Sequence, residues 1–184
     1  LSVSGDKMNV IYIGVDNHIS AAAEGPPADS VSAPMQGGSL TKAGPGKYIA
    51  RVSSVGNATV NVTATIDGQP KNMGSMVFRT KRIPDPVAEV GGSKGGMFSS
   101  AAFRVQKGVA AVLENFDFDA KFLVTSFTIG FDGTGFTDYT EQTSNSAYFT
   151  PAIIRDMQLC RPGTRVFIDD IRAKAPDGTT RTLP

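Results

Sequence analysis

The feature that most constrains this chain is a two-residue alternation of apolar and polar side chains in several short segments. In residues 60–66, valine, alanine and isoleucine occupy every second position, and asparagine or threonine fills the positions between. Successive side chains of a β-strand point to opposite faces, so this pattern predicts a half-buried strand that ends in a turn at Asp67 and Gly68. Three further strands are predicted over residues 8–13, 48–52 and 76–81.

The second half of the chain also favours strands. The longest one is predicted over residues 122–131, and a second is predicted over residues 165–171. We expect four side chains of the longer strand to share one face: Leu123, Phe127, Ile129 and Phe131.

One helix is predicted between these two strands, over residues 151–160. Thr150 followed by Pro151 is a typical helix start, because threonine caps the first turn and proline suits the first helical position. The apolar side chains that follow recur at helical spacing, and the last of them, Cys160, is interpreted as a small buried hydrophobe.

Two prolines one residue apart, Pro84 and Pro86, interrupt the strand pattern near the middle of the chain. A sheet cannot continue through them, because proline lacks a backbone donor and restricts the residue before it. We therefore expect two domains, residues 1–85 and 86–184, although a loop within one domain is the alternative. The predicted fold is mainly β, with two tandem Ig-like β-sandwich domains, of which the second has one short helix.

The composition narrows what such a fold can do. The chain carries 18 lysines and arginines against 17 aspartates and glutamates, and this balance argues against a nucleic-acid partner. Its single histidine and single cysteine exclude most zinc and cysteine–histidine chemistry. No apolar run approaches the roughly 20 residues that span a bilayer, and a chain that begins without Met is expected to be a piece of a longer or processed protein.

Three short motifs share letters with known sites, and each has a simpler interpretation. Residues 91–95 match G-x-S-x-G, but the only histidine, His18, lies upstream and no apolar strand leads into the motif, so a linker is favoured. Residues 132–135 read D-G-T-G without a second copy to form a carboxylate dyad, which favours a β-turn. Asp117 and Asp119 would share a strand face and could there contact a Ca²⁺ ion. Because Ca²⁺ needs more oxygen ligands than two carboxylates supply, a solvated strand edge is favoured.

The remaining polar residues also have structural interpretations. His18 follows Asp16 and Asn17 at an expected strand end and is interpreted as a turn residue. Asp169 and Asp170 are neighbours in a predicted strand, so they are expected to point to opposite faces. No catalytic residue, metal ligand or cofactor-binding residue is therefore expected, and an enzyme is the weakest interpretation.

Four segments are more specific than the alternation: residues 6–17, 78–86, 109–119 and 168–173. They resemble, in order, parts of the C-terminal periplasmic region of the GldM/PorM family, and the resemblance covers essentially the whole chain. One departure is His18, because the family more often carries a proline after the asparagine. That difference affects only the local turn.

The resemblance implies a non-catalytic structural component of the type IX secretion system, which exports proteins and supports gliding motility. In such proteins an N-terminal part anchors the chain in the inner membrane and pairs with GldL/PorL to form a proton-driven motor. The periplasmic part is a homodimer of stacked domains that reaches a ring of GldK/PorK lipoprotein and GldN/PorN at the outer membrane. This chain would supply the last two, distal domains of that periplasmic shaft.

Two sets of residues are expected to serve this role. The hinge at Pro84, Asp85 and Pro86 would set the angle between the domains. Three arginines are candidates for a protein contact, with solvated surface charge as the simpler interpretation: Arg155, Arg161 and Arg165. The competing class is a secreted adhesin or carbohydrate-binding β-sandwich module, which the lack of tryptophan and the presence of only 4 tyrosines disfavour.

Overall fold

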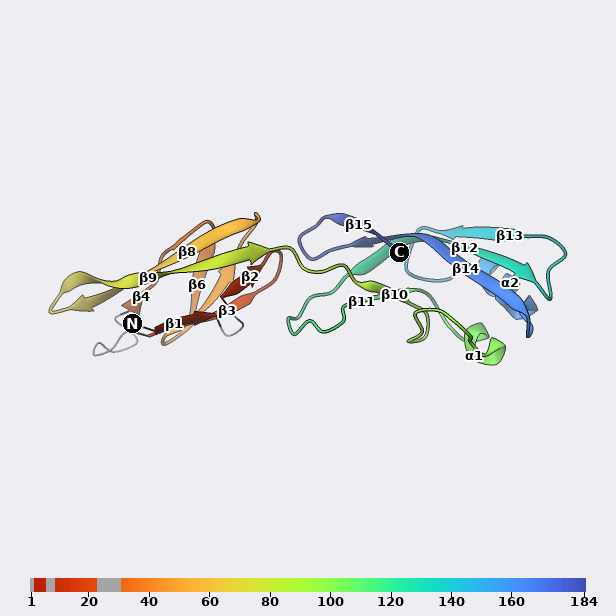
Figure 1. Cartoon of the computed structure of the whole chain (residues 1–184), viewed down its shortest axis with the longest axis horizontal. Helices are drawn as coiled ribbons and strands as arrows, with labels where there is room; N and C mark the ends of the chain where they lie inside the picture. Colours follow the sequence, from red (N-terminus) through yellow and green to blue (C-terminus); the bar gives the residue numbers. More distant parts are fainter. Residues whose placement is uncertain (1, 6–8, 23–30) are drawn as a thin grey trace. The chain divides into compact units, whose positions relative to one another are not determined.

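The structure is a computed structural model, shown in Figure 1. It describes residues 2–5, 9–22 and 31–184. Two compact units make up the chain: Ile83 ends the first and Pro84 begins the second, while residues 117–119 group with the first. Almost all regular structure in the described residues is β, with two short helices, so the prediction of a mainly β fold with two domains is confirmed.

The first unit is a sandwich of two β-sheets. Its strands are β1 (Ser2–Gly5), β2 (Val10–Tyr12), β3 (Asn17–Ala22), β4 (Val31–Ser32), β5 (Met35–Gln36), β6 (Ser39–Gly44), β7 (Lys47–Arg51), β8 (Gly56–Ile66) and β9 (Gln69–Lys81). One sheet has the order β1-β3-β7-β6, and the other has the order β2-β9-β8-β4, with β5 also paired to β8. The pairs are antiparallel except for β2 with β9. Met8, which belonged to the predicted first strand, lies outside the described residues.

The β8–β9 hairpin confirms the clearest sequence pattern. Val60, Val62 and Ala64 are buried on one face of β8, as the alternation predicted. Asp67 and Gly68 form the connecting turn with φ of 51° and 76°. Two consecutive residues with positive φ give the turn whose twist matches that of the flanking strands, and aspartate followed by glycine tolerates this conformation best.

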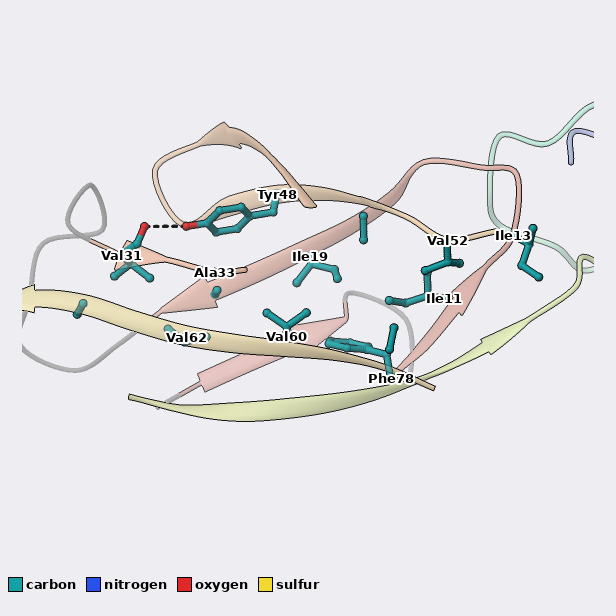
Figure 2. Close-up of a cluster of buried hydrophobic side chains, with 14 residues drawn as sticks. Ile11, Ile13, Ile19, Val31, Ala33, Tyr48, Val52, Val60, Val62 and Phe78 are labelled. Carbon is teal, nitrogen blue, oxygen red and sulfur yellow. Dashed lines mark hydrogen bonds between the residues drawn. The ribbon is translucent and has the colours of Figure 1, made fainter. Parts of the chain in front are cut away.

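Side chains from both sheets meet in one apolar core, shown in Figure 2. Ile19 comes from one sheet, Val60 and Phe78 come from the other, and all three are almost fully buried. Tyr48 packs at one end of this core, where its hydroxyl donates a 2.9 Å hydrogen bond to the backbone carbonyl of Val31. The hydrogen bond compensates for placing a polar group in the core, while burial raises the pKa of the Tyr48 phenol.

Asn17 closes the turn between β2 and β3. Its side chain accepts a hydrogen bond from the Tyr12 N–H at 2.8 Å and donates to the carbonyls of Tyr12, Val15 and Ala50 at 2.9, 3.0 and 3.2 Å. Because this amide completes the turn, β3 begins at Asn17 and His18 lies within the strand. The interpretation of His18 as a turn residue is therefore wrong.

The second unit contains one larger sheet, a two-stranded sheet and two helices. Its elements are β10 (Val87–Glu89), α1 (Ser100–Arg104), β11 (Ala110–Val112), β12 (Leu123–Gly133), β13 (Thr140–Ser144), α2 (Pro151–Leu159), β14 (Thr164–Lys174) and β15 (Thr180–Leu183). The larger sheet has the order β13-β12-β14-β15, and β10 pairs with β11. Buried side chains of β12, β14, β15, α1 and α2 contribute to its core, and apolar residues of β10 and β11 pack against it.

Helix α2 begins where the sequence predicts and ends one residue earlier than predicted, at Leu159. The Thr150 hydroxyl accepts a 3.3 Å hydrogen bond from the Ile153 N–H, and Pro151 is the first helical residue. Ile153 and Met157 are fully buried, whereas Ile154 is exposed. The second unit has one more helix than predicted, because the five residues of α1 are too few to display a helical repeat.

A break in strand register corrects the prediction for Leu123. The pairing of β12 with β14 shifts on both sides of Ser126, so Val124 is buried and Leu123 is exposed. A bulge inserts one residue into the alternation and so reverses the faces of the side chains beyond it. Phe127 and the two later residues of the predicted set, Ile129 and Phe131, are buried as expected.

The same irregularity extends to the aspartate pair of β14. Asp170 has a φ of 49°, and both Asp169 and Asp170 are exposed. Beyond this point Ile171 and Ala173 are buried, so the alternation resumes with its phase shifted by one residue.

We predict that Asn17→Ala destabilises the first unit by about 2 to 3 kcal/mol, because it leaves several buried backbone groups without a partner. Amide hydrogen exchange of the strands of the first unit measures this effect separately from the second unit. His18→Ala is the matched control, since the neighbouring side chain is exposed and its removal should change stability by less than about 0.5 kcal/mol. Equal exchange in the two variants would contradict the role assigned to Asn17.

Candidate functional site

The connector between the units is two exposed residues long. Ile83 is 2% exposed, and Pro86 is also fully buried, whereas Pro84 and Asp85 between them are exposed. Proline fixes its own φ and restricts the residue before it, so few backbone angles remain free in this segment. Of the three residues predicted to form the hinge, Pro86 therefore differs from the other two in being buried, and all three group with the second unit.

Asp85 is tied to the last strand of the second unit. Its carboxylate accepts a 2.6 Å hydrogen bond from Nη1 of Arg181, which lies on β15. The Arg181 guanidinium lies 5.2 Å from the centre of the Phe122 ring, and its Nη2 is 3.9 Å from the Asp177 carboxylate. This cluster fixes the start of the second unit to its C-terminal strand.

No sequence pattern points to Arg181, because Asp85 lies 96 positions away and no local pattern relates the two residues. The Arg181 side chain is 14% exposed while that of Asp85 is 66% exposed. The ion pair is thus partly open to water, and such pairs contribute at most about 1 kcal/mol.

The three candidate arginines do not gather on one face. Arg155 is exposed on α2, whose buried side chains pack on the core side of the sheet. Arg165 lies on β14 and alternates with Val166 and Ile168, which pack on the core, so it points away from that core. Arg161 donates from Nη1 to backbone carbonyls at the C-terminal end of α2, at 2.8 and 2.9 Å. It therefore stabilises a helix end, where a cation is favoured.

The motif at residues 91–95 forms a tight turn. Val90 and Ser93 exchange two backbone hydrogen bonds of 2.9 and 3.0 Å, and the Ser93 hydroxyl donates to the Gly95 carbonyl at 3.1 Å. A serine nucleophile needs a strand-to-helix turn that presents its hydroxyl to a base. The turn seen here supplies neither feature.

The two acidic motifs also take structural roles. The Phe136 N–H donates to the Gly133 carbonyl at 3.0 Å, which confirms the turn predicted for the D-G-T-G segment. Asp117 and Asp119 lie in a loop, not on a strand, so their prediction as a strand edge is wrong. The backbone there lacks the sheet pairing that would have placed both carboxylates on one face.

Cys160 follows α2 and is buried, as predicted. Burial raises the pKa of its thiol, which reduces the thiolate fraction near neutral pH. Within residues 2–5, 9–22 and 31–184, no group of three or more His, Cys, Asp or Glu side chains is placed to hold a metal ion. In the same ranges, no helix is both long and apolar enough to cross a membrane.

The fold and the connector define a class: tandem β-sandwich domains joined by a short, proline-restricted segment. Comparison with protein families makes this specific. The model of the GldM third domain matches residues 1–81, and the model of the GldM C-terminal domain matches residues 84–184. The chain belongs to the GldM family, and the resemblance predicted from its sequence is confirmed. This is a family of structural proteins of gliding motility and type IX secretion, not an enzyme family.

The comparisons with curated sequences and solved structures do not extend the assignment to the GldM family. No curated protein sequence gives a significant match. Among solved structures, the chain is similar to SGBP-B of the Bacteroides ovatus mixed-linkage glucan utilization locus in complex with a mixed-linkage heptasaccharide. The match has 13% identity and a TM-score of 0.29, and it covers 87% of this chain and 48% of the other. This chain thus spans about half the length of that protein, and so low a TM-score carries no conclusion about function.

We predict that Asp85→Asn loosens the start of the second unit without unfolding it. Losing an exposed ion pair should raise amide exchange at Val87 and Ala88 about two- to fivefold. Asp16→Asn is the matched control, because it breaks another exposed ion pair, the 2.6 Å contact with Arg51 in the first unit. If both variants left exchange at Val87 and Ala88 unchanged, the contact with Arg181 would have no anchoring role.

Proposed function

We propose that this chain is the distal part of a dimeric periplasmic shaft that links an inner-membrane, proton-driven motor to an outer-membrane lipoprotein ring. The ring would consist of GldK/PorK and GldN/PorN, and the motor partner GldL/PorL would meet the N-terminal part of the full-length protein. Membership of the GldM family supports the role in secretion and gliding. The observation that carries the mechanical part is the connector, whose two exposed residues lie between two buried ones.

A shaft transmits force only if its domains are stiff and its joints are short. Packed cores resist continuous deformation, and each unit has such a core. The connector adds few free backbone angles, because Pro84 and Pro86 are fixed in φ. We place the functional domain limits at residues 1–85 and 86–184, with the hinge at Pro84, Asp85 and Pro86. No side chain has to perform chemistry for this role.

We further propose that the chain acts as a homodimer. Among the described strands, β13 and β15 end the larger sheet of the second unit, and β1 and β6 end one sheet of the first. An open strand edge offers unpaired backbone groups to another chain, and proteins usually cover or disrupt such edges. A partner copy would cover them.

Replacing Pro84 with glycine should widen the range of angles between the units, because glycine restores backbone freedom to an exposed position. Small-angle X-ray scattering measures this as a broader distribution of intramolecular distances. Pro162→Gly is the control, since Pro162 is also exposed but lies in a turn within the second unit. Pro86 is unsuitable for this test, because it is fully buried and its loss would disturb packing. An unchanged scattering profile for Pro84→Gly would count against the hinge.

The purified chain should capture the outer-membrane lipoprotein ring from a membrane extract, and it should be dimeric by light scattering at tens of micromolar. An unrelated β-sandwich domain of similar size and charge controls for non-specific adsorption. Failure of a folded, dimeric sample would leave this chain as a spacer and assign ring binding to other domains. A monomeric mass would contradict the proposed dimer for this part of the protein.

A further inference from the structure

The outward face of the larger sheet of the second unit carries exposed side chains on β13 and β14. On β12, Phe127, Ile129 and Phe131 point into the core, so the residues between them point outward. Gly130 is one of these, and it lies between Glu141 of β13 and Phe167 of β14 in the strand register. These three positions form one row across the outward face.

Tyr139 lies across this row and covers Gly130. A Cβ atom built on Gly130 would overlap the Tyr139 ring and hydroxyl, so only glycine allows the ring to lie this close to the sheet. The Tyr139 hydroxyl donates a 2.8 Å hydrogen bond to the Glu141 carboxylate, which fixes the ring in this position. Tyr139 as a whole nevertheless remains 54% exposed, and Phe167 on the same face is 44% exposed.

Carboxylates surround the two aromatic side chains. Glu141 belongs to the row itself, Asp169 lies two residues beyond Phe167 on β14, and Asp132 lies two residues beyond Gly130 on β12. The hydrogen bond to Glu141, burial, and then the negative charges of Glu141 and Asp169 raise the pKa of Tyr139. Arg165, opposite Asp132, supplies the one cation of this group.

We propose that this outward face, which we name the Tyr139–Phe167 face, docks a basic segment of a partner protein through an arginine or lysine side chain. Aromatic rings attract cations to their faces, and nearby carboxylates strengthen that attraction through charge complementarity. The exposed rings provide the apolar contact area that a lone charge cluster lacks.

The proposal extends the proposed function, on which its biological setting rests, by identifying the chemistry of a partner of the distal domain. Its test does not use the ring complex. The outcomes therefore distinguish the two proposals. Peptide binding without ring capture would mean that the basic partner of this face is a protein other than the ring. Ring capture without peptide binding would support the shaft but contradict docking of a basic segment at this face.

The probe is a short peptide in which two arginines flank a valine, titrated into the ¹⁵N-labelled chain and followed by NMR. Amide shifts should concentrate on residues 128–132, 139–143 and 165–169. Tyr139→Ala should weaken binding roughly tenfold, because it removes the ring contact and the anchored position of Glu141. Glu141→Gln should weaken binding about threefold and reduce its dependence on salt.

Two controls match these variants. Tyr148→Ala removes the other exposed tyrosine of the second unit, and Glu114→Gln removes a carboxylate that pairs with Lys94 elsewhere. Both should bind the peptide like the unmodified chain. Gly130→Ala keeps every ring and charge but displaces Tyr139, so it should also lose affinity while α2 and the core keep their native shifts.

Besides a lack of peptide binding, four results would overturn the proposal. Shifts spread over the whole surface, or equal affinity of Tyr139→Ala and Tyr148→Ala, would show non-specific charge attraction. Shifts at these residues with a neutral β-glucan oligosaccharide, but none with the peptide, would make the face a sugar platform. Loss of the dimer in Tyr139→Ala, seen by light scattering, would show that a second copy occupies the face.

Discussion

Both units of this chain depend on a long antiparallel strand pair with one fully covered apolar face. In the first unit this pair is β8 with β9, whose buried face includes Val60, Val62 and Phe78. In the second unit it is β12 with β14, whose core side includes Ile129 and Phe131. Burying a large apolar side chain contributes about 1.5 to 3 kcal/mol, which exceeds the contribution of any exposed ion pair in either unit. Stability therefore resides on the inner faces, and the outward faces are free to carry other side chains.

The regular alternation of inward and outward side chains along these strands explains how much of the fold the sequence predicts. The alternation in residues 60–66 gave a strand with the correct buried face, because a regular pleat turns spacing directly into burial. The capping threonine at 150 gave the start of α2, because it acts on a backbone group three residues away. Both signals are local. The prediction for Leu123 fails because a bulge beside Ser126 adds one residue, and counting every second position cannot detect that insertion.

In the candidate site, sequence-based prediction fails for contacts between residues that are far apart in the chain. The prolines of the connector could be recognised from sequence because they act on their own backbone. The partner of Asp85 could not, because Arg181 reaches it only after β15 has joined the sheet. Asn17 was missed for a related reason: its amide looks like an ordinary turn residue until the carbonyl of Ala50 comes within 3.2 Å. Contacts that depend on tertiary structure leave no periodic trace in the sequence.

In the proposed shaft, the stiffness of the connector would come from its length rather than from the ion pair of Asp85 with Arg181. That pair is exposed and contributes at most about 1 kcal/mol, and both of its residues belong to the second unit, so it does not link the two units. Only Pro84 and Asp85 are exposed between two buried residues, so few torsions separate the units. Because proline has a fixed φ, Pro84 reduces the number of freely rotating torsions further. In the proposed shaft, covalent geometry would thus restrict bending at this joint, while the contact with Arg181 ties Asp85 to β15 within the second unit.

Gly130 gives the strongest reason to regard one outward face as more than solvated surface. A glycine inside a strand costs roughly 0.5 to 1 kcal/mol relative to alanine, and Tyr139, whose ring it admits, stays more than half exposed. The arrangement therefore adds little to the core. Its effect is to let the Tyr139 ring approach the sheet closely, with its hydroxyl hydrogen-bonded to Glu141. Rigid aromatic surface loses little conformational entropy when a partner covers it, which is the property that a docking face requires.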